Sequence, residues 1–162
     1  MKNLIFTTAV FLFALITSAQ DSVSISDFEI LNDTKWEGKL TYLDYQSGKL
    51  TSIETKLQVS IEGNRITSNI QYVYEPNKNN KSSVSIRKNG TLYGNEKVIS
   101  NKQTNDTRTI ITSYKGKDNG KKATIFITYK FNKNNYTISK KVVYKDGSES
   151  VIRNTYSFTK TK

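Results

Sequence analysis

The C-terminal part of the chain alternates between apolar and polar side chains, and this pattern constrains the fold more than any other feature. In steps of two, Ile, Val, Tyr and Phe fall on one side of residues 123–159, and mostly Thr, Ser and Lys fall on the other. Such alternation is typical of strands with one buried and one solvated face. Residues 132–135 and 146–148 interrupt it, and the Asp-Gly pair in the second break is a strong hairpin signal. We predict an antiparallel three-stranded meander.

The same alternation recurs upstream. It predicts strands near residues 34–44, 53–61 and 66–74, followed by shorter strands up to residue 115, and no stretch shows a period of 3.6 residues. A run of short strands joined by turns indicates a sandwich or a closed barrel, and closure is favoured because it removes exposed edges. We therefore expect residues 34–162 to form one all-β domain, a single antiparallel up-and-down β-barrel of about eight to ten strands.

The first residues have the features of an export signal. Met1-Lys2-Asn3 is followed by an apolar run over 4–16 and by small residues up to Ala19. A membrane anchor is the alternative, but a run of about 13 residues is shorter than the ~20 needed to cross a bilayer. We predict a signal peptide over 1–19 and export to the periplasm or the medium. Residues 20–33 would form an N-terminal arm over an end or edge of the sheet, with a short helical turn capped by Ser26.

The chain is strongly basic, with a formal net charge of +11. One interpretation is that lysines are spread along outward strand faces as solvated charge. The other is that the exterior attracts an anionic surface. Arginine, the residue suited to bidentate phosphate recognition, occurs only at four positions: Arg65, Arg87, Arg108 and Arg153. We predict no nucleic-acid partner, and keep contact with an anionic surface as the alternative.

The absence of two residue types limits the chemistry. The chain has no His and no Cys, which removes Ser–His–Asp triads, His-ligated zinc, thiol nucleophiles and Cys-bound clusters. A carboxylate pair could still perform acid–base work. Glu37 and Glu54 are the candidates, but both fall on the outward side of the alternation, as a solvated face would. We predict no catalytic residues, no metal, no cofactor and no enzyme activity.

Aromatic residues mostly share the inward phase and could line a cavity. Tyr is amphipathic, so a Tyr lining can hold an apolar ligand while its hydroxyl groups fix polar ends. The predicted ligand-binding residues are Trp36, Tyr42, Tyr72, Tyr74, Tyr129, Lys140, Tyr144 and Tyr156. The alternative is that these rings simply fill the core.

Lys140 is the unusual member of this set, because its phase places it between Ile138 and Val142. A buried Lys without a partner is costly. Either it meets an anionic ligand group inside the barrel, or a bulge around residues 140–141 turns it outward.

The segment 36–40 (Trp-Glu-Gly-Lys-Leu), together with 153–158 (Arg-Asn-Thr-Tyr-Ser-Phe), resembles the ends of a lipocalin-type barrel. More narrowly, the chain is similar to small exported lipocalin-like proteins of Bacteroidetes-type bacteria. The order Trp36 then Gly38 is reversed relative to that family, and no C-terminal helix follows. The resemblance implies a bound apolar or amphipathic small molecule, with Trp36 and Arg153 as a closing pair.

Three functional hypotheses follow. The first is a non-catalytic exported barrel that binds a small hydrophobic or amphipathic ligand in its interior. The second is a surface-binding module whose basic exterior holds anionic glycan, envelope lipid or a protein. The third is a structural or inhibitory domain without a small ligand, which the sequence does not separate from the others.

Overall fold

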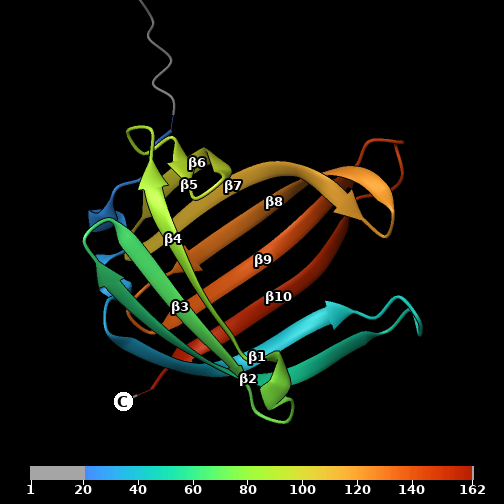
Figure 1. The fold of residues 1–162 in the computed structure, drawn as a ribbon, viewed down its shortest axis with the longest axis horizontal. Helices are drawn as coiled ribbons and strands as arrows, with labels where there is room; N and C mark the ends of the chain where they lie inside the picture. The colour runs from blue at the N-terminus through green and yellow to red at the C-terminus, as the bar shows by residue number, and fades with distance from the viewer. Residues whose placement is uncertain (1–20, 162) are drawn as a thin grey trace, which may run out of the picture.

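The computed structural model describes residues 21–161, which form a closed, ten-stranded antiparallel barrel (Figure 1). Each strand pairs with the next along the chain, and β1 pairs with β10 to close the cylinder. This order confirms the predicted all-β, up-and-down barrel. The predicted signal peptide, residues 1–19, lies outside the described residues, as does Gln20.

Tight turns and short 3₁₀ turns connect the strands. The strands are β1 (Thr34–Leu43), β2 (Leu50–Glu62), β3 (Arg65–Tyr72), β4 (Asn80–Arg87), β5 (Leu92–Tyr93), β6 (Glu96–Thr104), β7 (Thr107–Asp118), β8 (Lys121–Phe131), β9 (Asn135–Tyr144) and β10 (Val151–Lys160). The 3₁₀ turns are η1 (Ile25–Asp27), η2 (Glu29–Leu31) and η3 (Pro76–Lys78). Gly63 and Gly147 adopt positive φ in the β2–β3 and β9–β10 turns, a backbone conformation that glycine adopts without steric cost.

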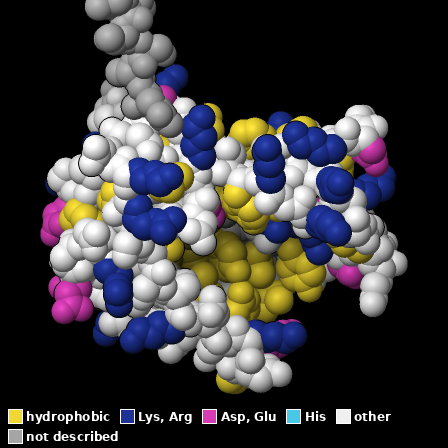
Figure 2. All heavy atoms as spheres, turned by 45° about the horizontal axis from the view of Figure 1, so that its top comes forward, with side chains coloured by type: hydrophobic (Ala, Val, Ile, Leu, Met, Phe, Trp, Pro, Cys, Tyr) yellow, Lys and Arg dark blue, Asp and Glu magenta, His cyan; other side chains and the backbone are white. Residues whose placement is uncertain are grey.

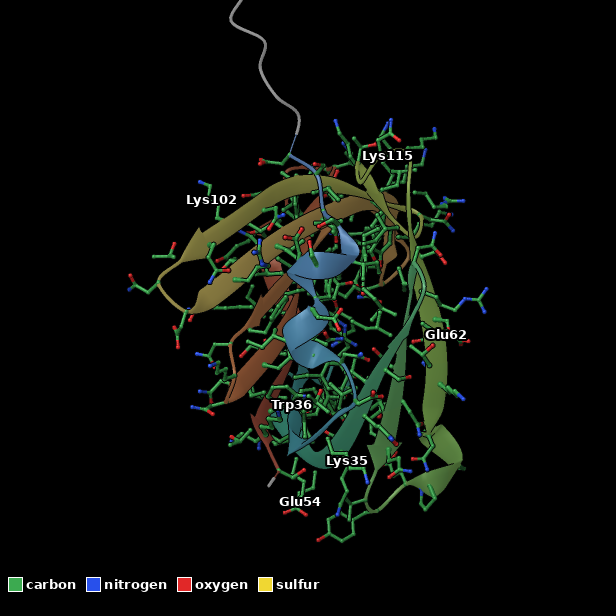
Figure 3. The ribbon with its side chains drawn as sticks, turned by 90° about the vertical axis from the view of Figure 1, so that its left-hand side faces the viewer. Lys35, Trp36, Glu54, Glu62, Lys102 and Lys115 are labelled. Carbon is green, nitrogen blue, oxygen red and sulfur yellow. The ribbon has the colours of Figure 1, made fainter. Side chains whose placement is uncertain are left out.

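The N-terminal arm fills one end of the barrel, where Figure 3 shows it lying across the strands. The Phe28 ring stacks on Tyr93 at 5.2 Å and on Phe131 at 5.8 Å between centroids. The Asp27 carboxylate ties the arm to the wall through an ion pair of 3.0 Å with Arg108 on β7. The arm thus packs over one end of the barrel.

The capping residue of the arm differs from the prediction. Ser24, not Ser26, precedes the first helical turn. The backbone N–H of Ser24 donates to the Asp27 carboxylate at 2.8 Å. The prediction of Ser26 as the cap is therefore wrong, because Asp27 is placed to bond the N–H three residues before it.

One part of the barrel wall is open because β5 is only two residues long. β5 pairs with β4 only at the C-terminal end of β4, at Ile86 and Arg87. β6 pairs with β7 only from Thr107 to Ser113 of β7. Among the strands of residues 21–161, segments 80–84 of β4 and 114–118 of β7 therefore each have a strand partner on one side only. In Figure 1, β4 crosses the front of the barrel, and β8, β9 and β10 of the far wall are seen to its right. We call the space between these two segments the side opening.

The register of the last meander settles the orientation of Lys140. β9 runs in unbroken register with β8, which pairs Lys140 with the inward Ile127. The register shift in this region lies in β10, between Ile152 and Asn154. The predicted bulge at 140–141 is therefore wrong, and Lys140 keeps the inward phase.

The predicted closing pair of Trp36 and Arg153 is also wrong, because the two side chains lie at opposite ends of the barrel. Trp36 is buried at the filled end, where its indole N–H donates to the Thr34 hydroxyl at 2.7 Å. Arg153 occupies the bulge of β10 and donates to the backbone carbonyl oxygen of Leu43, at the far end of β1.

No helix within residues 21–161 is long and apolar enough to cross a membrane.

Candidate functional site

The barrel has a filled end and a hollow end. At the filled end the largest side chains are fully buried: Phe28, Leu31, Trp36 and Phe131. Toward the other end, which we call the mouth, many inward-phase side chains are only half buried. They are Tyr42, Ile53, Tyr72, Tyr114, Ile138, Tyr144 and Tyr156. Figure 2 shows a hollow lined by apolar side chains in this region. A side chain that packs against neighbours on all sides is fully buried, so the difference in burial marks where the interior is not filled by protein.

The side opening leads toward this interior. A pocket of about 550 Å³ lies there between the β5–β6 turn and β7, and its wall includes Glu96, Tyr114 and Lys115. Glu96 and Tyr114 are inward-phase residues, whereas Lys115 is exposed. The pocket therefore has a polar outer margin and reaches side chains of the interior.

Lys140 stands in a row of inward positions that runs around the hollow. The strand register places Ile127 of β8, Lys140 of β9, Asn154 of β10 and Tyr42 of β1 side by side. Lys140 is half buried, and no described carboxylate lies within ion-pairing distance of its ammonium group. A partly desolvated ammonium without a counter-ion is unfavourable, so Lys140 gives the hollow an attraction for anionic groups.

Glu96 is an inward carboxylate on the other side of Ile127. The Thr112 hydroxyl donates to its Oε2, and the Tyr129 hydroxyl donates to the same oxygen at 3.3 Å. Burial raises the pKa of Glu96, although these two hydrogen bonds oppose the shift. Thr112 pairs with Ile127, which pairs with Lys140, so β7 and β8 lie between Glu96 on β6 and Lys140 on β9.

A hydroxyl bridge spans the hollow between β3 and β10. The Tyr72 and Tyr156 hydroxyls lie 2.7 Å apart. Burial, followed by this hydrogen bond, raises the pKa of Tyr156. The Tyr156 hydroxyl therefore stays protonated, and the two hydroxyls are polar contact points inside an apolar wall.

A second polar group, the mouth cluster, consists of Tyr45, Asp118, Tyr144 and Arg153. Both Tyr45 and Tyr144 donate hydroxyl hydrogen bonds to Asp118 Oδ2, the latter at 2.9 Å. Arg153 Nε lies 3.7 Å from Asp118 Oδ1, and its guanidinium group lies 4.0 Å from the Tyr45 ring centroid. The cluster fastens the β1–β2 loop to the end of β7 across the mouth.

The structure brings together only some of the residues predicted to bind a ligand. Tyr42, Tyr72, Lys140 and Tyr156 are half buried around the hollow, with Tyr129 beside Glu96 and Tyr144 in the mouth cluster. Trp36 is 1% exposed and belongs to the core, and Tyr74 follows the end of β3 and is 74% exposed. Trp36 and Tyr74 therefore do not line the hollow.

Four residues of the site were missed by sequence reasoning: Tyr45, Glu96, Tyr114 and Asp118. Asp118 had a usable signal, because it stands on the inward phase of its strand directly before an Asn-Gly turn. Glu96 is the first residue of β6, where a register shift between Val98 and Ser100 breaks the alternation, and Tyr45 lies in a loop. The roles of these residues depend on which strands become neighbours in the barrel, and the sequence alone does not give that.

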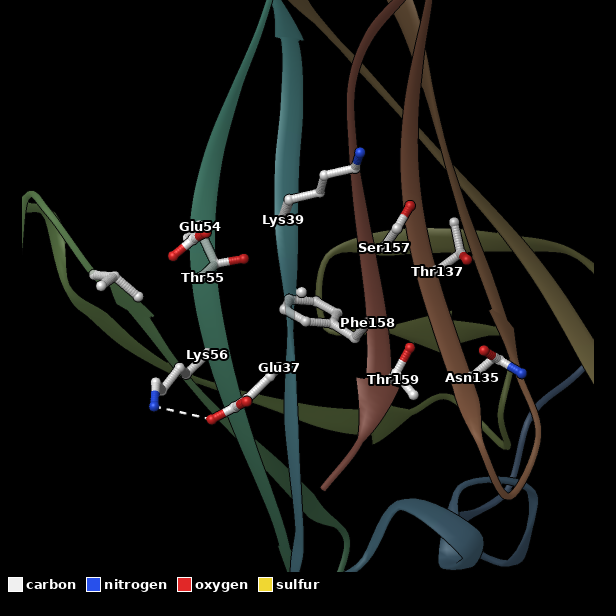
Figure 4. A pocket seen from close by; sticks show the side chains of 12 residues that line it. Glu37, Lys39, Glu54, Thr55, Lys56, Asn135, Thr137, Ser157, Phe158 and Thr159 are labelled. Atoms are coloured by element: carbon white, nitrogen blue, oxygen red, sulfur yellow. Dashed lines mark hydrogen bonds and ion pairs between the residues drawn. The ribbon is translucent and has the colours of Figure 1, made fainter. Parts of the chain in front are cut away.

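A separate groove of about 780 Å³ lies on the outer face of β2, β1, β10 and β9 (Figure 4). Gly38 has no side chain to occupy the groove, and an added Cβ at this position would collide with the backbone carbonyl oxygen of Ser157. Glu37 and Glu54, the predicted carboxylate candidates, lie here on the outer surface, and Glu37 pairs with Lys56 at 2.9 Å. Most residues that line the groove are polar or charged, and the groove is distinct from the hollow.

The described residues contain no group of three or more Asp or Glu side chains arranged to hold a metal ion.

The comparisons with known proteins give a fold but no family. No family model matches the chain, and no curated protein is similar to it in sequence. The crystal structure of Rv2717c from M. tuberculosis is similar over 88% of this chain and 100% of that chain, with a TM-score of 0.59 and 11% sequence identity. At this identity the similarity shows the barrel fold alone, and the resemblance to lipocalin-type proteins stays a prediction.

Proposed function

We propose that this protein is a non-catalytic, exported carrier that binds a small hydrophobic or amphipathic molecule in the hollow at the mouth of its barrel. The observation that supports the proposal most directly is the contrast between the fully buried filled end and the half-buried, apolar inward side chains of the hollow. Export rests on the predicted signal peptide at 1–19.

The hollow offers a ligand both apolar area and polar anchors. Removing apolar surface from water is worth about 25 cal/mol per Å², and the half-buried rings and aliphatic side chains supply such surface. The paired hydroxyls of Tyr72 and Tyr156 can donate to or accept from a polar ligand group. Together these groups favour an amphipathic ligand over a purely polar one.

Lys140 indicates the charge of the polar end. Its ammonium group faces the hollow without a described carboxylate partner. A ligand carboxylate at this position would supply the missing counter-charge, and charge-assisted hydrogen bonds are the stronger class. The proposed ligand is therefore an apolar molecule with an anionic group.

Native mass spectrometry of protein purified from its own host tests the proposal. We expect extra mass that is lost when the same sample is denatured, and that mass identifies the class of ligand. A bare mass under both conditions, together with no uptake of an added fatty acid, would contradict the proposal.

A Lys140→Met variant tests the anionic group. A fluorescent fatty acid such as parinaric acid should bind the unchanged protein about tenfold more tightly than its methyl ester does, because only the acid can pair with the ammonium group. The variant should lose this preference while its free energy of unfolding stays equal or rises. Lys130→Met, at an exposed outward position of β8, is the matched control and should keep the preference.

A further inference from the structure

Lysines form a continuous row on the outside of the barrel near the mouth. Lys117 of β7 is directly opposite Lys122 of β8. The backbone N–H of Lys145, directly after the end of β9, donates to the carbonyl oxygen of Lys122 at 2.9 Å, so Lys145 is the third lysine of the row. With their exposed outward neighbours they make up the lysine face: Lys97, Lys115, Lys117, Lys122, Lys141 and Lys145.

This face has no compensating negative charge of its own. The acidic residues within β6 to β9 are Glu96 and Asp118, and both side chains point inward to hydroxyl partners. None of the lysines of the face takes part in a described ion pair. An ion pair of 3.0 Å between Lys121 and Asp146 lies beside it in the turns. Because like charges directly opposite each other destabilise a sheet, the row is unfavourable for the isolated protein.

On the opposite side of the barrel, by contrast, positive and negative charges face each other. There Glu37 is opposite Lys56 and Glu54 is opposite Lys39, both in register across β1 and β2. In Figure 3, Lys115 lies on the other side of the barrel from Lys35 and Glu54. The lysine face is therefore less balanced in charge than the outer surface of β1 and β2.

Apolar side chains interrupt the lysines of this face. Phe126 lies between Ser113 and Lys141, and Ile152 lies on the other side of Lys141. Ile152 is 50% exposed, and Phe126 is half buried. Surfaces that combine lysines with exposed apolar groups match the interface of a bilayer, where headgroups meet acyl chains.

We propose that the lysine face docks the protein on an anionic lipid bilayer. Lysines near a negatively charged membrane each strengthen attraction about fivefold, and Phe126 and Ile152 would contact the acyl boundary. A nucleic acid or a sulfated glycan would leave these apolar groups without a partner. The face also carries no arginine, the residue best suited to paired contacts with individual phosphates.

The position of the lysine face determines which part of the barrel would lie next to the membrane. Lys97 and Lys115 line the pocket at the side opening. Docking through this face would therefore bring the opening close to the membrane surface. The inference does not depend on the proposed ligand, because the vesicle experiment below measures attachment alone.

The test compares two charge-matched variants in vesicle flotation, using protein purified from its own host so that every sample has the same N-terminus. The first variant is Lys117→Gln/Lys122→Gln/Lys145→Gln, and the control is Lys35→Gln/Lys39→Gln/Lys81→Gln, whose lysines are exposed on β1 and β4. With vesicles of phosphatidylcholine and phosphatidylglycerol at low salt, the first should bind roughly 100-fold more weakly than the unchanged protein. The control should lose less than tenfold. Vesicles of phosphatidylcholine alone should bind none of the three.

Loss of binding in the first variant cannot come from unfolding, because removing like charges that face each other should leave stability equal or higher. Equal losses in the two variants would overturn the proposal, since binding would then follow net charge alone. Tight binding to heparin without binding to the anionic vesicles would also overturn it. An Ile152→Ser variant should weaken attachment to vesicles but not to heparin, and an equal effect on both would count against lipid.

Discussion

Among the described residues, Thr55 on β2 carries the buried side-chain oxygen that has no hydrogen-bond partner. Thr112 on β7 is equally buried, but its hydroxyl donates to Glu96. An unpaired buried hydroxyl costs roughly 1–3 kcal/mol. We therefore expect Thr55→Val to raise the free energy of unfolding by about 1 kcal/mol, and Thr112→Val to lower it by about the same amount because Glu96 loses a donor. Urea denaturation measures both, and a loss of stability in both variants would contradict the assignment.

The buried carboxyl group of Glu96 should make stability depend on pH. Burial raises its pKa in the folded protein above the usual value of 4.5, so the folded state binds a proton more tightly than the unfolded state does. The contribution of Glu96 is then most favourable below pH 4.5 and is lost as pH rises through the folded pKa. We expect Glu96→Gln to be more stable than the unchanged protein near pH 7, with the gap closing toward pH 4.

Thermal unfolding of the two proteins across this range checks the sign. Glu62→Gln on β2 is the matched control, because this carboxyl group is exposed and the substitution removes the same charge. A gap that widens as pH falls would mean that Glu96 is stabilised as a carboxylate.

Arg153 shows how one irregular position in a strand can organise an entire end of the barrel. It stands in the bulge of β10 and contacts the Leu43 carbonyl oxygen, Asp118 and the Tyr45 ring. We expect Arg153→Met to lower the free energy of unfolding by about 1–3 kcal/mol, because the guanidinium group bonds to a carboxylate and a carbonyl. Hydrogen exchange of residues 43–49 should become faster. Arg65→Met is the control, since Arg65 is exposed and has no described ion pair. Unchanged exchange would show that the mouth cluster does not hold the loop.

The regular strands could be predicted because alternation is a local property of the sequence. Ile125, Ile127 and Phe131 are buried along β8, as the period of two required. The position of the bulge could not be predicted. The sequence shows that the alternation is interrupted in the last meander, but an extra residue in either β9 or β10 would account for the interruption. The partners of Arg153 favour the bulge in β10, and one of them, Leu43, is more than 100 residues away in the chain.

At the level of the whole molecule, closure of the barrel followed from the count of strands and from the cost of exposed edges. The hollow could not be predicted in this way, because it depends on how far each strand extends beside its neighbour. Residues 84–99 predict short strands, but only the pairing of the strands shows that β5 ends after Tyr93 and leaves one edge of β4 and one edge of β7 unpaired toward the mouth. The lysine row has the same origin. Lys117 and Lys122 are close in the chain, on either side of the β7–β8 turn, but Lys145 comes much later, and its alignment with them is a consequence of register.

The side opening also bears on how fast a ligand would come and go. A cavity sealed by a lid admits its ligand only as often as the lid moves, and such motions take microseconds to milliseconds or longer. Here the wall is interrupted by the length of β5 itself, so entry and exit need no rearrangement of the backbone. Association would then be limited by encounter, and residence time by affinity alone. A barrel of this kind is suited to exchanging the proposed ligand quickly rather than to storing it.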